Sequence, residues 1–146
     1  MFRPGRRLFS IAAICLVLTA AAHTMGHFQP PPTDAATTNL LTTIENYQIS
    51  LGLGMNPSYR NITDSLSLFM SIALLFWGVQ NLLLAKLDHE GRILRSLTLL
   101  NIVWVGAVAI LFWRFQILPA VISMIVTEAF LVLSWLLPAP RTWPID

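Results

Sequence analysis

A single acidic residue, Glu128, lies deep inside the last long apolar segment of this 146-residue chain. If that segment is a membrane-spanning helix that begins near Ile117, a rise of about 1.5 Å per residue places the carboxyl group roughly 16 Å along it, near the bilayer centre. A charge is costly there, and no Lys, Arg or His is expected at the same depth, so the neutral acid is favoured unless water reaches it. Two interpretations stay open: a carboxyl group that binds a ligand or exchanges a proton, and a neutral acid hydrogen-bonded inside a helical bundle.

Two tryptophans, Trp77 and Trp104, are expected at neighbouring depths, and their indole N–H groups can donate hydrogen bonds to a carboxyl group. With Glu128 they form the candidate ligand-binding set. Glu128 is also the candidate acid or base if the protein is an enzyme, with the two indoles shaping a pocket for a lipophilic substrate. The sequence contains no glycine-rich phosphate loop, CxxC pair or HExxH motif, so hydrolytic or nucleotide chemistry of the soluble type has no support.

His23 and His27 are four residues apart, so on a helix they share one face, and this spacing can ligate a metal ion. A third ligand could come from the acidic residues of the region that follows, which are Asp34, Glu45 and Asp64. The alternative is that both histidines are polar residues at the membrane surface. No cofactor is predicted.

Four segments are long and apolar enough to cross a bilayer as helices. They run over about Leu8–Gly26, Ser65–Ala85, Leu97–Trp113 and Ile117–Leu137. The chain is 55% hydrophobic and 11% charged, with a mean hydropathy of +0.67. One domain of this length could not hide so much apolar surface in a soluble core, so the surplus must face lipid. The predicted fold is all-α: a four-helix transmembrane bundle with a short outer amphipathic helix, formed by a single integral membrane domain over residues 1–146.

The basic residues are divided unequally between the two sides of such a bundle. Of the nine Lys and Arg residues, only Arg60 and Arg114 fall outside the predicted cytoplasmic segments. Because basic residues are retained in the cytoplasm during insertion, both termini are predicted to be cytoplasmic. The net charge of +2 reflects these anchors rather than a basic stripe interleaved with aromatic residues, so no nucleic-acid partner is expected.

The first apolar segment has a second interpretation. Arg6-Arg7, the apolar residues after them and Ala20-Ala21-Ala22 resemble a secretory signal with a small-residue cleavage site. Cleavage would leave a three-helix protein that begins at His23. The apolar stretch continues through Met25 and Phe28, which favours an uncleaved helix, and the alternative stays open.

Residues 33–64 form an outer segment that is too long to be a simple turn. Within Asn39–Ile49 apolar residues recur at helical spacing, which predicts a short amphipathic helix on the bundle or the outer leaflet. The apolar stripe consists of Leu40, Leu41, Ile44, Tyr47 and Leu51. Thr63 or Asp64 is the predicted N-terminal cap of the second spanning helix.

Small and polar residues recur at helical intervals within the apolar segments. Because lipid competes equally for apolar contacts, such residues are typical of the faces through which membrane helices pack. The two predicted faces are Ser67, Ser71, Gly78, Asn81 and Ala85 on the second helix, and Ala120, Ser123, Thr127 and Ser134 on the fourth. Asn81 and Asn101 fall at similar depths on the second and third helices, which predicts an interhelical hydrogen bond between their amides.

The order of these parts carries a family resemblance. Tyr59-Arg60 and Asp64 precede Ser65–Ser71, which leads into Leu75–Asn81. This arrangement resembles a family of small, uncharacterised bacterial four-helix membrane proteins, in which an Arg and an Asp precede a Gly/Ser-Phe-Ser-Leu start to the second helix. Arg60 and Asp64 match that pattern, while Asp64-Ser65 stands where the family has glycine. The resemblance implies a bacterial inner membrane and carries no known activity.

The leading functional hypothesis is a non-enzymatic membrane protein that binds a small ligand or lipid, or serves as a partner subunit. The lipid bilayer is its expected environment, and another membrane protein is a candidate partner. The alternative is a small integral membrane enzyme or proton-linked carrier that acts on a lipophilic substrate through Glu128. A second alternative is a metal site on the outer face at His23 and His27.

Overall fold

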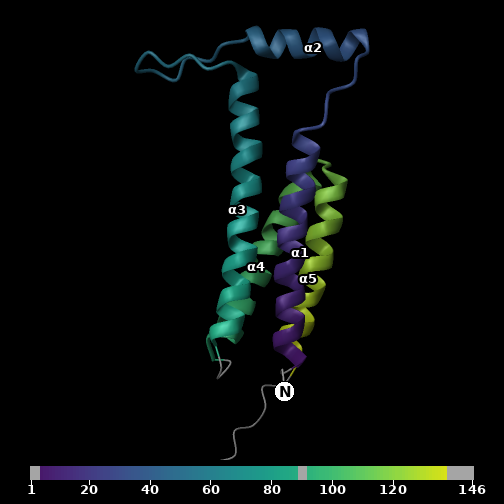
Figure 1. Ribbon diagram of the computed structural model, residues 1–146, viewed down its shortest axis with the longest axis vertical. Helices are drawn as coiled ribbons and strands as arrows, with labels where there is room; N and C mark the ends of the chain where they lie inside the picture. The colour runs from purple at the N-terminus through teal and green to yellow at the C-terminus, as the bar shows by residue number, and fades with distance from the viewer. Residues whose placement is uncertain (1–3, 89–91, 138–146) are drawn as a thin grey trace, which may run out of the picture. The chain divides into compact units, whose positions relative to one another are not determined.

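The computed structural model describes residues 4–88 and 92–137. Within these ranges the chain forms five α-helices and no β-strand. They are α1 (Pro4–His27), α2 (Ala35–Asn46), α3 (Tyr59–Leu87), α4 (Arg92–Arg114) and α5 (Leu118–Leu136) (Figure 1). Every helix except α2 is long and apolar enough to cross a membrane. The predicted all-α fold, with four membrane-spanning helices and one short helix outside the spans, is confirmed.

Three spanning helices begin earlier than hydropathy predicts. α1 begins at Pro4 rather than Leu8, α3 at Tyr59 rather than Ser65, and α4 at Arg92 rather than Leu97. The added turns contain polar and basic residues. A search for apolar segments excludes such residues, although their backbone forms helical hydrogen bonds like any other. These three helices therefore extend beyond their apolar segments.

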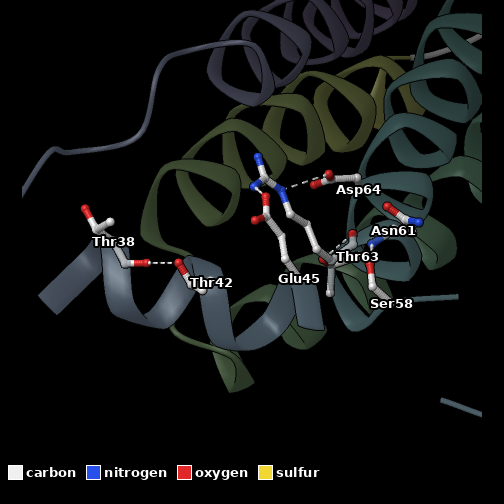
Figure 2. Close-up of polar contacts among 8 residues, drawn as sticks. Thr38, Thr42, Glu45, Ser58, Asn61, Thr63 and Asp64 are labelled. Atoms are coloured by element: carbon white, nitrogen blue, oxygen red, sulfur yellow. Dashed lines mark hydrogen bonds and ion pairs between the residues drawn. The ribbon is translucent and has the colours of Figure 1, made fainter. Parts of the chain in front are cut away.

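The predicted cap of α3 at Thr63 or Asp64 is wrong, because both residues lie inside the helix. α3 begins directly after Ser58, whose Oγ accepts a hydrogen bond from the backbone N–H of Asn61 at 3.2 Å (Figure 2). Ser58 thereby satisfies one of the N–H groups that a helix leaves without a partner in its first turn. The Thr63 hydroxyl instead donates to the carbonyl of Arg60 at 2.9 Å.

The contacts within the chain divide it into two compact units. Unit 1 comprises residues 1–19 and 74–146, and unit 2 comprises residues 20–73. Unit 1 thus contains the first part of α1, the last part of α3, and all of α4 and α5. Unit 2 contains α2 together with the remaining parts of α1 and α3. A single integral membrane domain stays a prediction.

In unit 1, α4 and α5 form an antiparallel helical hairpin. The turn between them is tight: Gln116 adopts a φ of 59°, and the Ile117 N–H donates to the carbonyl of Phe112 at 3.0 Å. Pro119 follows in the first turn of α5, where its missing N–H costs little. Because the turn is short, residues at similar distances before and after it lie at similar depths along the two helices.

The other helix contacts of unit 1 use small and polar residues. Gly78 of α3 packs so closely on α1 that a Cβ there would lie 2.7 Å from Val17 Cγ2 and 2.9 Å from the carbonyl oxygen of Ala13. α5 contacts the start of α1 through Ser134, whose hydroxyl donates to the carbonyl of Gly5 at 2.7 Å. Such close approaches are the usual source of affinity between helices in lipid.

The predicted hydrogen bond between Asn81 and Asn101 is confirmed. Asn81 Nδ2 donates to Asn101 Oδ1 at 2.8 Å, and Asn101 Nδ2 lies 3.4 Å from Asn81 Oδ1. Asn101 Nδ2 also donates to the carbonyl of Leu97 at 2.7 Å. The two residues are only 3% and 2% exposed, so the pair joins α3 to α4 inside unit 1.

In unit 2 the amphipathic helix is present but begins and ends earlier than the stripe predicts. α2 ends at Asn46, so Tyr47 and Leu51 fall outside it. They belong to a short hairpin in which Ile49 N–H donates to the Pro57 carbonyl at 3.0 Å and Tyr59 N–H to the Tyr47 carbonyl at 2.8 Å. The hairpin turns at Gly52, Leu53 and Gly54, which all have positive φ. No residue of α2 is buried.

The N-terminus of α2 is capped by Asp34, whose carboxylate accepts from the Thr37 hydroxyl at 2.6 Å and from the Thr37 N–H at 2.9 Å. These two hydrogen bonds hold the pKa of the Asp34 carboxyl below its usual value. The bond from the Thr37 hydroxyl has the larger effect and the bond from the backbone N–H the smaller. A group with a lowered folded-state pKa stabilises the fold above its unfolded pKa and loses that contribution as pH falls through the folded value.

We therefore expect α2 to lose amide protection in acid, as the Asp34 carboxylate takes up a proton. Hydrogen exchange of the α2 amides at several pH values measures this loss. In the matched variant Asp34→Asn, which keeps an accepting oxygen and does not titrate, protection should change less with pH. Equal pH dependence in the two proteins would show that the cap is not the titrating element.

Candidate functional site

Glu128 lies at the edge of the buried face of α5. That face consists of Val121, Met124, Thr127, Leu131 and Ser134, which recur at helical spacing. The hydroxyl of Thr127, the residue before Glu128, donates a hydrogen bond to the carbonyl of Ser123 at 2.9 Å. The hydroxyl therefore has its partner within α5. The Glu128 side chain is half-buried beside this face.

The Glu128 carboxyl group lies against α4 at Gly106. Oε1 is 3.8 Å from the position that a Cβ on Gly106 would occupy, which is an ordinary van der Waals distance. Oε2 is inaccessible and has no hydrogen-bond partner among residues 4–88 and 92–137. A buried polar atom without a partner costs free energy, which a donor supplied from elsewhere or a change of protonation would recover. The α4–α5 contact therefore contains a carboxyl group with unused hydrogen-bonding capacity.

The two tryptophans of the candidate set contact each other. Trp77 of α3 and Trp104 of α4 meet edge to face, with ring centroids 5.5 Å apart and planes at 71°. Within the described part of the chain neither indole donates a hydrogen bond to Glu128. Positions 104 and 106 are about 200° apart around a helix, so the indole pair and Glu128 contact different faces of α4. A joint role of the three residues in ligand binding stays a prediction.

The two histidines are both helical, because α1 continues through His27 before the prolines that follow it. His23 Nε2 lies 3.2 Å from the hydroxyl of Ser67 on α3, and His27 contacts the Phe28 ring edge-on at 5.0 Å. Among the residues that the structure describes, no group of three His, Cys, Asp or Glu is arranged to hold a metal ion.

Two acidic residues considered as a third metal ligand form ion pairs with Arg60. Glu45, near the end of α2, contacts the Arg60 guanidinium, and Asp64 lies 3.6 Å from Arg60 Nε one helical turn further along α3 (Figure 2). The guanidinium thus joins α2 to the start of α3. All three side chains are substantially exposed, so the pairs orient these elements more than they stabilise them.

Sequence reasoning missed Gly106, the residue of α4 beside which the Glu128 carboxyl group lies. A usable signal was present in the tight turn over Arg114–Ile117. Gly106 and Glu128 are separated from this turn by similar numbers of residues. Because the turn joins two antiparallel helices, the two residues lie at similar depths. The same reasoning also missed Asp34 as a helix cap, although an Asp directly before a helical segment is a known N-terminal signal.

No protein-family model, curated protein or solved structure matches the chain. The fold and its apolar helices define the class of protein as a multi-pass helical membrane protein. The comparisons leave membership of the bacterial four-helix family unconfirmed.

Proposed function

We propose that the protein is a non-enzymatic membrane protein that binds a hydrogen-bond donor at Glu128, where α5 meets α4. The proposal is supported by one observation: Glu128 Oε2 is buried without a hydrogen-bond partner among the described residues. The donor belongs to a small lipophilic ligand, including a lipid, or to a polar side chain on a spanning helix of a partner subunit. In either case the hydrogen bond forms where water does not compete for it.

The alternative proposal is an enzyme or proton-linked carrier for a lipophilic substrate, in which Glu128 exchanges a proton. It is favoured by the Trp77–Trp104 pair, because Trp104 is 55% exposed and offers an aromatic surface to such a substrate. A metal site at His23 and His27 is the third proposal, supported by their shared helical spacing alone.

The test compares Glu128→Leu with Glu128→Gln, using Val126→Leu, an exposed neighbour on α5, as the control. The protein is extracted in mild detergent and its retained molecules are identified by native mass spectrometry. We expect Glu128→Leu to lose a bound ligand or partner that the wild type and the control keep. Glu128→Gln should keep it, since the amide retains an accepting oxygen. Equal retention in all four proteins would contradict the proposal.

The stability of the ligand-free protein separates these proposals from a purely structural role. No carboxyl hydrogen bond to a described residue is lost in Glu128→Leu, so we expect its unfolding free energy to be unchanged or raised by about 1 kcal/mol. A loss of similar size would indicate that Glu128 stabilises the bundle itself. If the group exchanges a proton, Glu128→Gln should instead remain folded while the pH dependence of ligand retention disappears.

We also propose that the protein lies in a bacterial inner membrane with both termini in the cytoplasm. Support comes from the basic residues at one end of unit 1, Arg6 and Arg7 on α1, Lys86 on α3 and Arg95 on α4, against Arg114 at the other end. Arg3 and Arg141, which share the predicted cytoplasmic side, lie outside the described residues.

Reporter fusions test this topology. A fusion after Asp146 should report the cytoplasm and an insertion near Ala36 the opposite compartment, because three spans, α3, α4 and α5, separate the two positions. A C-terminal fusion that reports the outer compartment would contradict the four-span arrangement. A mature N-terminus at His23 would instead show that the first helix is cleaved.

A further inference from the structure

A groove of 420 Å³ opens between the start of α1 and the end of α3, and both segments belong to unit 1. Its polar residues are Arg6, Arg7 and Ser10 of α1 and Lys86 of α3. Ile11 and Leu82 form its apolar wall, and none of the described residues that line it is acidic. We call this feature the basic groove. Its volume is in the range of pockets that hold small molecules.

Three basic side chains line the basic groove, and they differ in their hydrogen bonding. Arg6 Nη2 donates to the carbonyl oxygen of Lys86 at 2.7 Å, which ties the start of α1 to the last turn of α3. Within the described residues, the Arg7 guanidinium and the Lys86 ammonium form no hydrogen bond or ion pair, and both side chains are exposed. The groove therefore has one arginine that joins its two walls and two cationic groups able to bind an anion.

The basic groove lies at the ends of two helices that are long and apolar enough to cross a membrane. α1 begins at Pro4 and α3 ends at Leu87, so the charged residues occupy the terminal turns of two spanning helices. Ile11 and Leu82 lie about one turn further into each span. A molecule that fills the groove along the membrane normal would place an anionic group beside Arg7 and Lys86 and an apolar chain beside Ile11 and Leu82.

We propose that the basic groove binds an anionic phospholipid, with its phosphate between Arg7 and Lys86. Charge complementarity selects an anion, and the adjoining apolar wall selects an anion attached to an acyl chain. A soluble phosphate would leave that wall uncovered, and a zwitterionic lipid would gain less from two cations. This inference is independent of the ligand proposed at Glu128, which lies on α5 and has no part in the groove.

The test offers the full-length protein equal amounts of phosphatidylglycerol and phosphatidylcholine in neutral detergent, with retained lipids counted by native mass spectrometry. The wild type should prefer phosphatidylglycerol. Arg7→Gln and Lys86→Gln should each reduce the preference about fivefold, and the double variant about 30-fold, as expected for one and two lipid-facing charges. The matched control is Arg95→Gln, which removes a charge from the same end of unit 1 without altering the groove, and should keep the preference.

Three results would overturn the proposal. The first is that the double variant keeps the wild-type preference for phosphatidylglycerol. The second is that Arg95→Gln reduces this preference as much as Arg7→Gln does. The third is that glycerol phosphate competes as strongly as the lipid. A photoactivatable phosphatidylglycerol provides a test on the wild type that needs no variant to fold. Crosslinks within residues 4–19 and 82–88 support the site, and crosslinks confined to other segments contradict it. None of these outcomes bears on Glu128.

Discussion

Replacing Gly78 with alanine should destabilise the protein by about 1–3 kcal/mol, the usual cost of forcing extra volume into a closely packed contact. The added Cβ would lie 2.7 Å from Val17 Cγ2, 2.9 Å from the Ala13 carbonyl oxygen and 3.1 Å from the Val17 nitrogen. Two of these three atoms belong to the backbone of α1, so no rotamer change can remove the overlap. α1 and α3 would have to move apart, with loss of the dispersion contacts on which association in lipid depends.

The unfolding free energy in mixed micelles measures this effect. Gly26→Ala is the matched control, because the same exchange on α1 meets no atom within 4 Å. Alanine is also the better helix former, so the control should be neutral or slightly stabilised. If Gly78→Ala unfolds at the same denaturant concentration as Gly26→Ala, the close contact of α3 with α1 at this position is refuted.

The number and approximate position of the spanning helices could be predicted because hydrocarbon accepts only segments whose backbone is satisfied internally. Long apolar runs in this composition therefore have to be helices. The depth of Asn81 and Asn101 followed from the same spans, and an amide pair at one depth in lipid has few other partners. That prediction is confirmed by the 2.8 Å hydrogen bond.

Helix ends could not be predicted by the same means, because hydropathy records transfer to lipid and helix hydrogen bonding does not stop at the lipid boundary. Tyr59 to Asp64 extend α3 beyond its apolar segment, and the ion pair of Arg60 and Asp64 spans one turn there. In α2 the apolar period continued through Tyr47 and Leu51, but the positive φ angles at Gly52 and Gly54 favour a hairpin turn. Backbone preferences there outweighed the periodicity.

The site could be predicted only in part. Composition and depth identified Glu128 as the unusual residue, since a carboxyl group in hydrocarbon is costly wherever it points. The direction of its side chain depends on the rotation of α5 against α4, which no single span encodes. Gly106 lies opposite the carboxyl group at that contact, and its relevance follows only when the two helices are paired.

The buried amide pair should give the second large effect. Asn101→Leu keeps the branched shape of the side chain but removes both the acceptor of Asn81 Nδ2 and the donor that Asn101 supplies to Asn81 and to Leu97. Asn81 would then be buried without its partner, which costs about 1–3 kcal/mol. We expect Asn101→Leu to lower the unfolding free energy by that amount, and Asn81→Leu to act similarly by leaving the Asn101 oxygen unpaired.

The double variant Asn81→Leu/Asn101→Leu should be more stable than the sum of the two single losses predicts, because no amide is then left buried alone. A coupling energy of about 1 kcal/mol, the scale of an interhelical hydrogen bond in lipid, is the expected result. The control combines Asn101→Leu with Gly26→Ala. Gly26 is distant in sequence and a Cβ there meets no atom within 4 Å, so the two changes in unfolding free energy should be additive. Additivity in the asparagine pair itself would mean that the two amides do not stabilise α3 against α4 through each other.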